Sequence, residues 1–148
     1  MVTAEDNRWR HCDLKTISLV GNVLMRQLAA DAGAVETVMF RDGNLTEASA
    51  SNVLVVIGAG IVAPPKDNLI LPGITYGATY EFAQEAGIPF SIRPVSRAEA
   101  LGASEMWLTS STKEVLAVTT VDGAPFAGGR PGPVFRKMHA LFQAHKPR

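Results

Sequence analysis

The sequence predicts an α/β domain built on a mixed sheet. Short runs of β-branched and apolar residues alternate along the chain with segments in which apolar residues recur at helical spacing. Glycine-containing turns join some of the strands into local hairpins. Hairpins argue against a purely doubly wound parallel sheet, and the interspersed helices argue against a β-sandwich. With 148 residues, 47% of them apolar, the chain suits one domain with its own core.

The first half of the chain is expected to form a strand, a helix and two hairpins. The strand lies near the start of residues 1–14, and the helix begins at Thr16 or Ser18 and ends at Gly33, a natural helix stop. Residues 34–47 alternate in polarity and turn at 42–43, which indicates a hairpin. A second hairpin joins residues 52–57 to residues 61–63.

The second half is expected to alternate between helices and strands. A helix covers residues 75–85 and ends at Gly87, and a strand covers residues 90–95. Ser96 and Glu99 have the spacing of a capping box, which predicts a short helix over residues 96–103. Two strands follow, at 105–111 and 114–123. A helix with prolines in its first turn closes the chain at 131–145.

The stretch NVLVVIGAGIVAPP, residues 52–65, has the glycine spacing of a dinucleotide-binding loop. That loop requires a helix directly after the glycines, because the helix N-terminus holds the pyrophosphate. Here only three residues separate Gly60 from Pro64 and Pro65, and a helix cannot run through that pair. We therefore interpret residues 58–60 as a hairpin turn.

Composition excludes several classes of protein. Fourteen basic and fourteen acidic residues give zero formal net charge, so neither nucleic acid nor an anionic membrane is expected as a partner. Cys12 is the one cysteine, which excludes an internal disulfide and favours a reducing cytoplasm. The three histidines have no metal-binding spacing. No apolar run approaches the length of a membrane span, and residues 1–15 are too polar for a secretory signal.

Polar residues that could carry chemistry interrupt the apolar background at Lys15, at Glu47, at 73–75 and at 109–112. Each signal is weak alone, and three have ordinary explanations: Lys15 as a solvated charge, 73–75 as a helix N-cap and 109–112 as a turn. Together they fit a cofactor with a carbonyl and a phosphate. An amine can form a Schiff base once it is neutral, which desolvation favours. A carboxylate can pair with a ring nitrogen, and a helix N-terminus with nearby hydroxyls can hold a phosphate. Pyridoxal phosphate needs these groups from a protein.

The chain resembles the class IV (fold type IV) pyridoxal-phosphate aminotransferases, and within them the D-amino-acid transaminases more than the branched-chain branch. The resemblance covers nearly the whole chain, in the family's order, through RHCDLKTISLVGNVL, NLTEASASNVLVV, NLILPGITYGATYEFAQEAGI and EMWLTSSTKEVLAVTTVDG. It implies the fold of the family's large, cofactor-binding domain, in which the mixed sheet partly closes into a barrel with packed helices. It also implies pyridoxal 5'-phosphate as cofactor and a homodimer.

The resemblance assigns roles to individual residues. Lys15 matches the lysine that carries the cofactor as a Schiff base and moves the substrate's α-proton, and Glu47 matches the carboxylate that bonds the ring nitrogen. The remaining matched positions contact the ring or the phosphate: Ser49 near the cofactor, Leu71 on the ring face, and Ile74, Thr75, Ser110 and Ser111 at the phosphate. Ala48 and Ala50 depart from the Gly and Ser often found there.

The implied reaction is transfer of an amino group from D-alanine or a similar D-amino acid to a 2-oxo acid. Branched-chain transamination and aminodeoxychorismate lyase chemistry would use the same Lys15 and Glu47. A non-catalytic module that acts only by association is an alternative of another class. The family's smaller N-terminal domain, which supplies substrate-carboxylate groups, is not matched by residues 1–148. We therefore expect this chain alone to have little or no activity.

Overall fold

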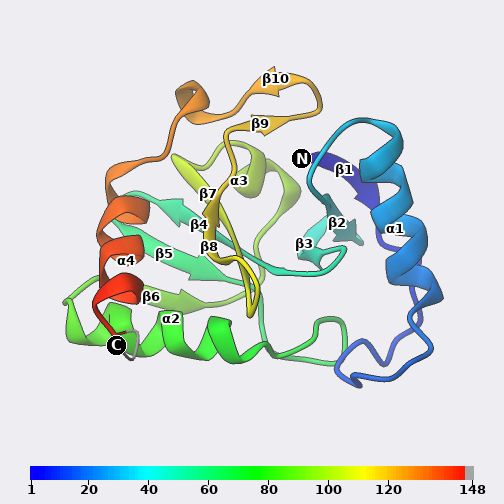
Figure 1. Cartoon of the computed structure of the whole chain (residues 1–148), viewed down its shortest axis with the longest axis horizontal. Helices are drawn as coiled ribbons and strands as arrows, with labels where there is room; N and C mark the ends of the chain where they lie inside the picture. Colours follow the sequence, from blue (N-terminus) through cyan, green and yellow to red (C-terminus); the bar gives the residue numbers. More distant parts are fainter. Residues whose placement is uncertain (146–148) are drawn as a thin grey trace.

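The architecture consists of two main sheets with the three longer helices on their outer sides (Figure 1). The computed structural model describes residues 1–145. The smaller sheet has the order β1-β2-β3, with β1 parallel to β2 and β2 antiparallel to β3. The larger sheet has the order β6-β5-β4-β7-β8, in which only the β5–β6 pair is parallel. Strands β9 and β10 form a separate hairpin.

The strands are β1 (Val2–Glu5), β2 (Thr37–Arg41), β3 (Asn44–Ala48), β4 (Asn52–Ile57), β5 (Gly60–Ala63), β6 (Phe90–Ile92), β7 (Glu105–Ser110), β8 (Glu114–Ala117), β9 (Thr120–Val121) and β10 (Ala124–Pro125). The helices are α1 (Val20–Asp31), α2 (Ile74–Glu85), α3 (Arg97–Leu101) and α4 (Pro133–Ala144), with a 3₁₀ turn at Ala127–Gly129. The prediction of an α/β fold with a mixed sheet is confirmed.

The expected closure of the sheet into a partial barrel is wrong, because no sheet of the described residues closes. The strand ladder breaks between β3 and β4. There the chain reverses through residues 49–51, where the Ala48 N–H donates to the Ser51 carbonyl at 2.8 Å. Strand β4 then pairs with β5 and β7 instead of β3. A barrel requires an unbroken ladder of hydrogen bonds around its circumference, which this turn interrupts.

The run NVLVVI forms a strand that is buried on both faces. Val53 and Val55 face the core between the two sheets, whereas Leu54 and Val56 face the core beneath α2 and α4. Successive side chains of a strand point to opposite faces, so a continuous apolar run indicates a central strand with both faces covered. The pairing of β4 with β7 continues to Asn52, which lies opposite Thr109.

The helices differ in how much apolar surface they bury. Helices α2 and α4 both pack against the larger sheet, and the end of α4 crosses the C-terminal part of α2 (Figure 1), where Phe82 contacts Phe142. The N-terminus of α4 is fixed by Glu105, whose carboxylate accepts from the Val134 and Phe135 amides at 2.9 and 2.7 Å. Helix α1 covers the smaller sheet through Met25 and Ala29 and leaves an apolar face exposed. No helix within residues 1–145 is long and apolar enough to cross a membrane.

Several element boundaries differ from the sequence-based expectation. Helix α1 begins at Val20, because the Thr16 hydroxyl accepts from the Ser18 amide at 3.1 Å and holds residues 16–18 in a turn. The strand expected over 114–123 splits into β8 and β9. Asp122 and Gly123 adopt positive φ angles of 48° and 79° and form a hairpin turn to β10, which the sequence did not indicate. Both predicted hairpins and the capping box at Ser96 are confirmed.

Candidate active site

A cavity of about 310 Å³ lies where β4 begins and β7 ends. Four segments far apart in sequence line it: the stretch that leads into α1, residues 47–52, the approach to α2, and the turn after β7. The lining contains all eight residues singled out from the sequence: Lys15, Glu47, Ser49, Leu71, Ile74, Thr75, Ser110 and Ser111. Thr75 and Ser110, which the phosphate hypothesis requires to meet, therefore share one cavity.

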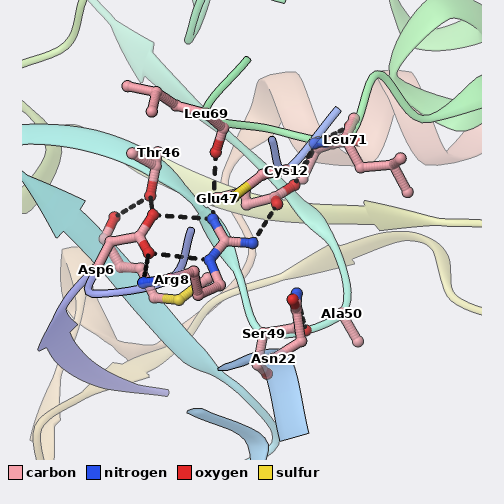
Figure 2. A network of polar contacts seen from close by, with 12 residues as sticks. Asp6, Arg8, Cys12, Asn22, Thr46, Glu47, Ser49, Ala50, Leu69 and Leu71 are labelled. Atoms are coloured by element: carbon pink, nitrogen blue, oxygen red, sulfur yellow. Dashed lines mark hydrogen bonds and ion pairs between the residues drawn. The ribbon is translucent and has the colours of Figure 1, made fainter. Parts of the chain in front are cut away.

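Glu47 forms the buried polar wall of the cavity, with 4% of its surface exposed. Its Oε1 accepts from Arg8 Nη1 at 2.6 Å, and its Oε2 accepts from Asn52 Nδ2 at 3.2 Å and the Leu71 amide at 3.1 Å. Figure 2 shows Glu47 between Arg8 and Leu71. A carboxylate offers about four acceptor positions. These three protein donors therefore leave one position for a ligand.

Arg8 belongs to a buried cluster of charges behind Glu47 (Figure 2). Its Nε and Nη2 donate to the two oxygens of Asp6, both at 2.9 Å, while Arg41 Nη2 donates to Asp6 Oδ1 at 3.0 Å. The Thr46 hydroxyl donates to Asp6 Oδ2 at 2.9 Å. Two arginines and two carboxylates balance in charge, which makes their burial tolerable.

The electrostatics of this cluster act on Glu47 in opposite directions. Burial raises the pKa of the Glu47 carboxyl, and the charge and hydrogen bond of Arg8 lower it, with a net pKa of about 7. Burial alone would lower the pKa of the Arg8 guanidinium, but its bonds to Asp6 and Glu47 outweigh burial and raise it. Arg8 therefore stays charged while Glu47 can exchange a proton near neutral pH.

Asn52 connects Glu47 to the start of α2. In addition to its bond to Glu47, its Nδ2 donates to the Leu71 carbonyl at 2.7 Å, and its Oδ1 accepts from the Gly73 amide at 3.2 Å. A Cβ at Gly73 would lie 2.4 Å from that Oδ1, so the approach requires glycine. The segment before α2 is thereby held at a fixed distance from the buried carboxylate.

The N-terminus of α2 opens into the cavity without a side-chain cap. The first amides of a helix have no partner inside the helix, and the helix dipole adds a partial positive charge, so this end favours an anion. Thr75 is buried here and Ile74 is exposed. The turn at Ser110 and Ser111 lines the same cavity. The neighbouring Thr109 hydroxyl is buried without a hydrogen-bond partner in the part of the chain described.

Lys15 lines the cavity from the irregular segment ahead of α1, and its side chain is exposed. The desolvated setting expected for this amine is therefore not found among the described residues. The same segment contributes Trp9, Cys12 and Leu14 to the lining. Within residues 1–145, no cluster of His, Cys, Asp or Glu could hold a metal ion.

Sequence reasoning missed Arg8, Asn52 and Asn22. Asn22 Nδ2 donates to the Ser49 carbonyl at 3.1 Å and ties α1 to the cavity wall (Figure 2). The one signal for Arg8 is its spacing from Asp6 in EDNRWR, a pattern that on its own predicts a solvated surface. Arg41, at the end of β2 beside the 42–43 turn, pairs with Asp6 and completes the buried cluster.

The sequence profile of the Amino-transferase class IV family matches residues 1–121. The chain belongs to this family. D-alanine aminotransferase from Bacillus licheniformis is 38% identical over 142 residues, which cover 96% of this chain and 50% of that protein. The chain thus spans about half the length of the curated relatives it matches.

Solved structures of the family share the fold. A branched-chain amino acid aminotransferase from T.th., complexed with N-(5'-phosphopyridoxyl)-L-glutamate, superimposes with a TM-score of 0.88 at 25% identity, covering 97% of this chain and 50% of that one. The fold IV-transaminase CpuTA1 from Curtobacterium pusillum has a TM-score of 0.84 at 26% identity, and the match covers 98% of this chain and 53% of that one. Class IV aminotransferases depend on pyridoxal phosphate.

The residues of the cavity fit pyridoxal phosphate. An amine, a carboxylate with one open acceptor position, and an uncapped helix N-terminus beside two hydroxyls match a carbonyl, a ring nitrogen and a phosphate in turn. The volume lies at the lower end of the ~300–1,000 Å³ range typical of small-molecule pockets.

Proposed function

We propose that the chain is the cofactor-binding domain of a pyridoxal-phosphate aminotransferase that moves an amino group from D-alanine or another D-amino acid to a 2-oxo acid. The observation that carries this proposal is the meeting of Lys15, the open acceptor position of Glu47 and the α2 N-terminus in one cavity. The D-amino-acid substrate is supported by the higher identity to D-alanine aminotransferases, 38%, than to the branched-chain enzyme, 25%.

Lys15 is the proposed catalytic residue. Bound pyridoxal phosphate supplies an electron-withdrawing ring that makes the α-hydrogen of an attached amino acid acidic. The Lys15 Nζ would hold the cofactor covalently in the resting protein. The same Nζ would move the proton between the α-carbon of the amino acid and the C4′ atom of the cofactor. Lys15 is exposed in this structure, so burial against the bound cofactor would supply the desolvation that favours the neutral amine.

Glu47 is proposed to control the proton on the ring nitrogen. With a pKa of about 7, its carboxyl can share a proton with a nitrogen placed at the open acceptor position. The bonds from Arg8, Asn52 and Leu71 fix the carboxylate, so little reorganisation is needed when charge moves onto the ring. Leu71 would pack on the ring face and Ser49 would lie beside the cofactor.

The phosphate is proposed to bind between Ile74 and Thr75 at the start of α2 and the hydroxyls of Ser110 and Ser111. A phosphate is held well by helix amides and hydroxyl donors together. No arginine of residues 1–145 lines the cavity. A clamp for the substrate carboxylate is therefore not provided by these lining residues, and we propose that residues 1–148 alone transaminate slowly.

Borohydride reduction tests the role of Lys15. Reduction in the presence of pyridoxal phosphate, followed by peptide mapping, should place the label on Lys15, and Lys15→Ala should lose it. Lys66→Ala is the matched control, because Lys66 lies over the Tyr76 ring and does not line the cavity. The competitors also include Lys113, Lys137 and Lys146, of which Lys146 lies outside the described residues. A label chiefly on another lysine would overturn the assignment, and a protein that stays colourless with the cofactor would favour the non-catalytic alternative.

The reaction itself is tested by mixing the chain with a separately produced N-terminal half of a relative. The mixture should convert D-alanine with 2-oxoglutarate much faster than the chain alone. Preference for L-leucine would instead support the branched-chain alternative.

Self-association is part of the proposal. The exposed apolar face of α1 gathers Val20, Val23 and Leu24, with 69%, 63% and 58% of their surfaces exposed. Continuous exposed apolar surface is costly in water, and a homodimer would cover it. A monomeric mass in sedimentation at micromolar concentration would contradict this part.

A further inference from the structure

Glu36 is a buried carboxylate that does not line the cavity but contacts two of the turns that do. None of its surface is exposed, and it directly precedes β2. Its Oε2 accepts from the Ala50 amide at 2.7 Å and the Ser49 hydroxyl at 3.2 Å, and its Oε1 accepts from the Ser51 hydroxyl at 2.6 Å. These bonds hold the whole turn between β3 and β4 on one carboxylate.

The fourth donor to Glu36 comes from the other side of the cavity. Lys113 Nζ donates to Oε1 at 2.7 Å from the turn between β7 and β8. That turn carries Ser110, whose hydroxyl accepts from the Lys113 amide at 3.2 Å. The two turns lie at the same end of the larger sheet, since the ladder between β4 and β7 ends where Asn52 lies opposite Thr109. Beyond this point no ladder hydrogen bonds join the two segments. The ion pair between Lys113 and Glu36 connects them instead.

We infer that Glu36 is a positioning residue that, through Lys113, fixes the spacing between the 49–51 and 110–113 turns and thereby the phosphate end of the cavity. This inference rests on the proposed function, in which Ser110 and Ser111 bind the phosphate. Hydrogen-bond donors that are held in place before a ligand arrives lose less entropy on binding. The affinity for the phosphate should therefore depend on the ion pair between Glu36 and Lys113.

The arrangement also assigns a role to the charge of Lys113. A free cation beside Ser110 and Ser111 would attract a phosphate directly. Here the ammonium is paired with a carboxylate whose other acceptor positions are filled by the 49–51 turn. Lys113 therefore acts on the phosphate through the position of its turn rather than through its charge, and the two roles predict opposite results when Glu36 is neutralised.

Two ligands distinguish this role from a general effect on folding. Affinities for pyridoxal phosphate and for pyridoxal, which lacks the phosphate, are measured by absorbance for the wild type, Lys113→Met, Glu36→Gln and the double variant. Lys113 is half-buried, so Lys113→Met is the variant more certain to fold. Glu5→Gln, which breaks the exposed ion pair with Arg97, is the matched control.

We expect each single variant to weaken binding of pyridoxal phosphate about tenfold, equivalent to one lost hydrogen bond, and binding of pyridoxal by less than about twofold. The double variant should bind no more weakly than the weaker single variant, because both remove the same link. Equal losses for the two ligands would overturn the inference. Tighter phosphate binding by Glu36→Gln would also overturn it, since that result would mean that the released Lys113 binds the phosphate by charge.

A second measurement needs no cofactor. Lys113→Met should shift the ¹⁵N–¹H resonance of Ala50, 63 positions away in sequence, because both residues donate to Glu36. An unchanged Ala50 resonance would show that the turns are not coupled. A wild-type chain that binds neither ligand would refute the proposed function, and the Ala50 shift would then decide on the coupling by itself.

Discussion

Glu47 and Glu36 are two buried glutamates on either side of the same turn, and their environments differ in one respect that separates a ligand site from a structural one. Glu47 has three donors and an acceptor position left at the cavity. Glu36 has four donors and lies outside the lining. Since a carboxylate accepts about four hydrogen bonds, Glu36 is saturated by the protein and Glu47 is not.

The two pKa values follow this difference. Burial raises the pKa of Glu47 to about 7 against the opposing charge of Arg8, and nearby Asp6 adds to the rise. Burial also acts to raise the pKa of Glu36, but its bonds to Lys113, Ser51 and Ala50 outweigh burial and leave it below the ordinary value. Burial alone therefore does not decide the protonation of a carboxyl; the number and charge of its donors do.

The largest expected effect on stability comes from removing the arginine that pairs with Glu47. Arg8→Met would leave Glu47 buried without an arginine partner and Asp6 paired with Arg41 alone, and we expect a loss of about 3–5 kcal/mol in unfolding free energy. Urea unfolding measures the loss. Arg136→Met is the control, since Arg136 is exposed and should change stability by less than about 0.5 kcal/mol. Similar losses for both variants would mean that the charge cluster is not a stabilising unit.

The pH dependence of stability should separate the two carboxyls. The pKa of Glu47 rises from 4.5 to about 7 on folding, so the folded state binds the extra proton and stability falls as pH rises through this window, by about 3 kcal/mol. Glu47→Gln should remove this slope. The pKa of Glu36 is lowered, so its contribution is present above pH 4.5 and is lost as pH falls below it. Glu36→Gln should change the pH dependence of stability only below pH 4.5. A change between pH 4.5 and 7 in this variant would contradict the assignment of that pH dependence to Glu47.

The smallest effect tests the link from Glu47 to α2. Gly73→Ala should force Asn52 away from Glu47 and cost about 1–3 kcal/mol, because its Cβ would overlap the amide oxygen. Gly77→Ala in the same helix meets nothing within 4 Å, and we expect it to stabilise by about 0.5–1 kcal/mol. Thermal unfolding of the pair measures the difference. Two equally stable variants would show that Asn52 does not need the glycine.

Some of the site was predictable from the sequence because its signals are local or lie at fixed spacing. The Asp42-Gly43 turn, the apolar run of β4 and the capping box at Ser96 each depend on neighbouring residues, and each was predicted. The set of candidate cavity residues came from the family resemblance, and they line one cavity. Their chemical roles stay predictions that the labelling and binding experiments test.

Local patterns were enough to predict where most helices and strands form, since hydrophobic period and turn chemistry act over a few residues. The break in the ladder after β3 was visible only in the folded chain, as was the bond from Arg8 to Glu47 across 39 positions. The same holds for Lys113, which reaches Glu36 across 77 positions. A buried charge is stable only beside a partner, and that partner is chosen by the path of the folded chain, which no local pattern records.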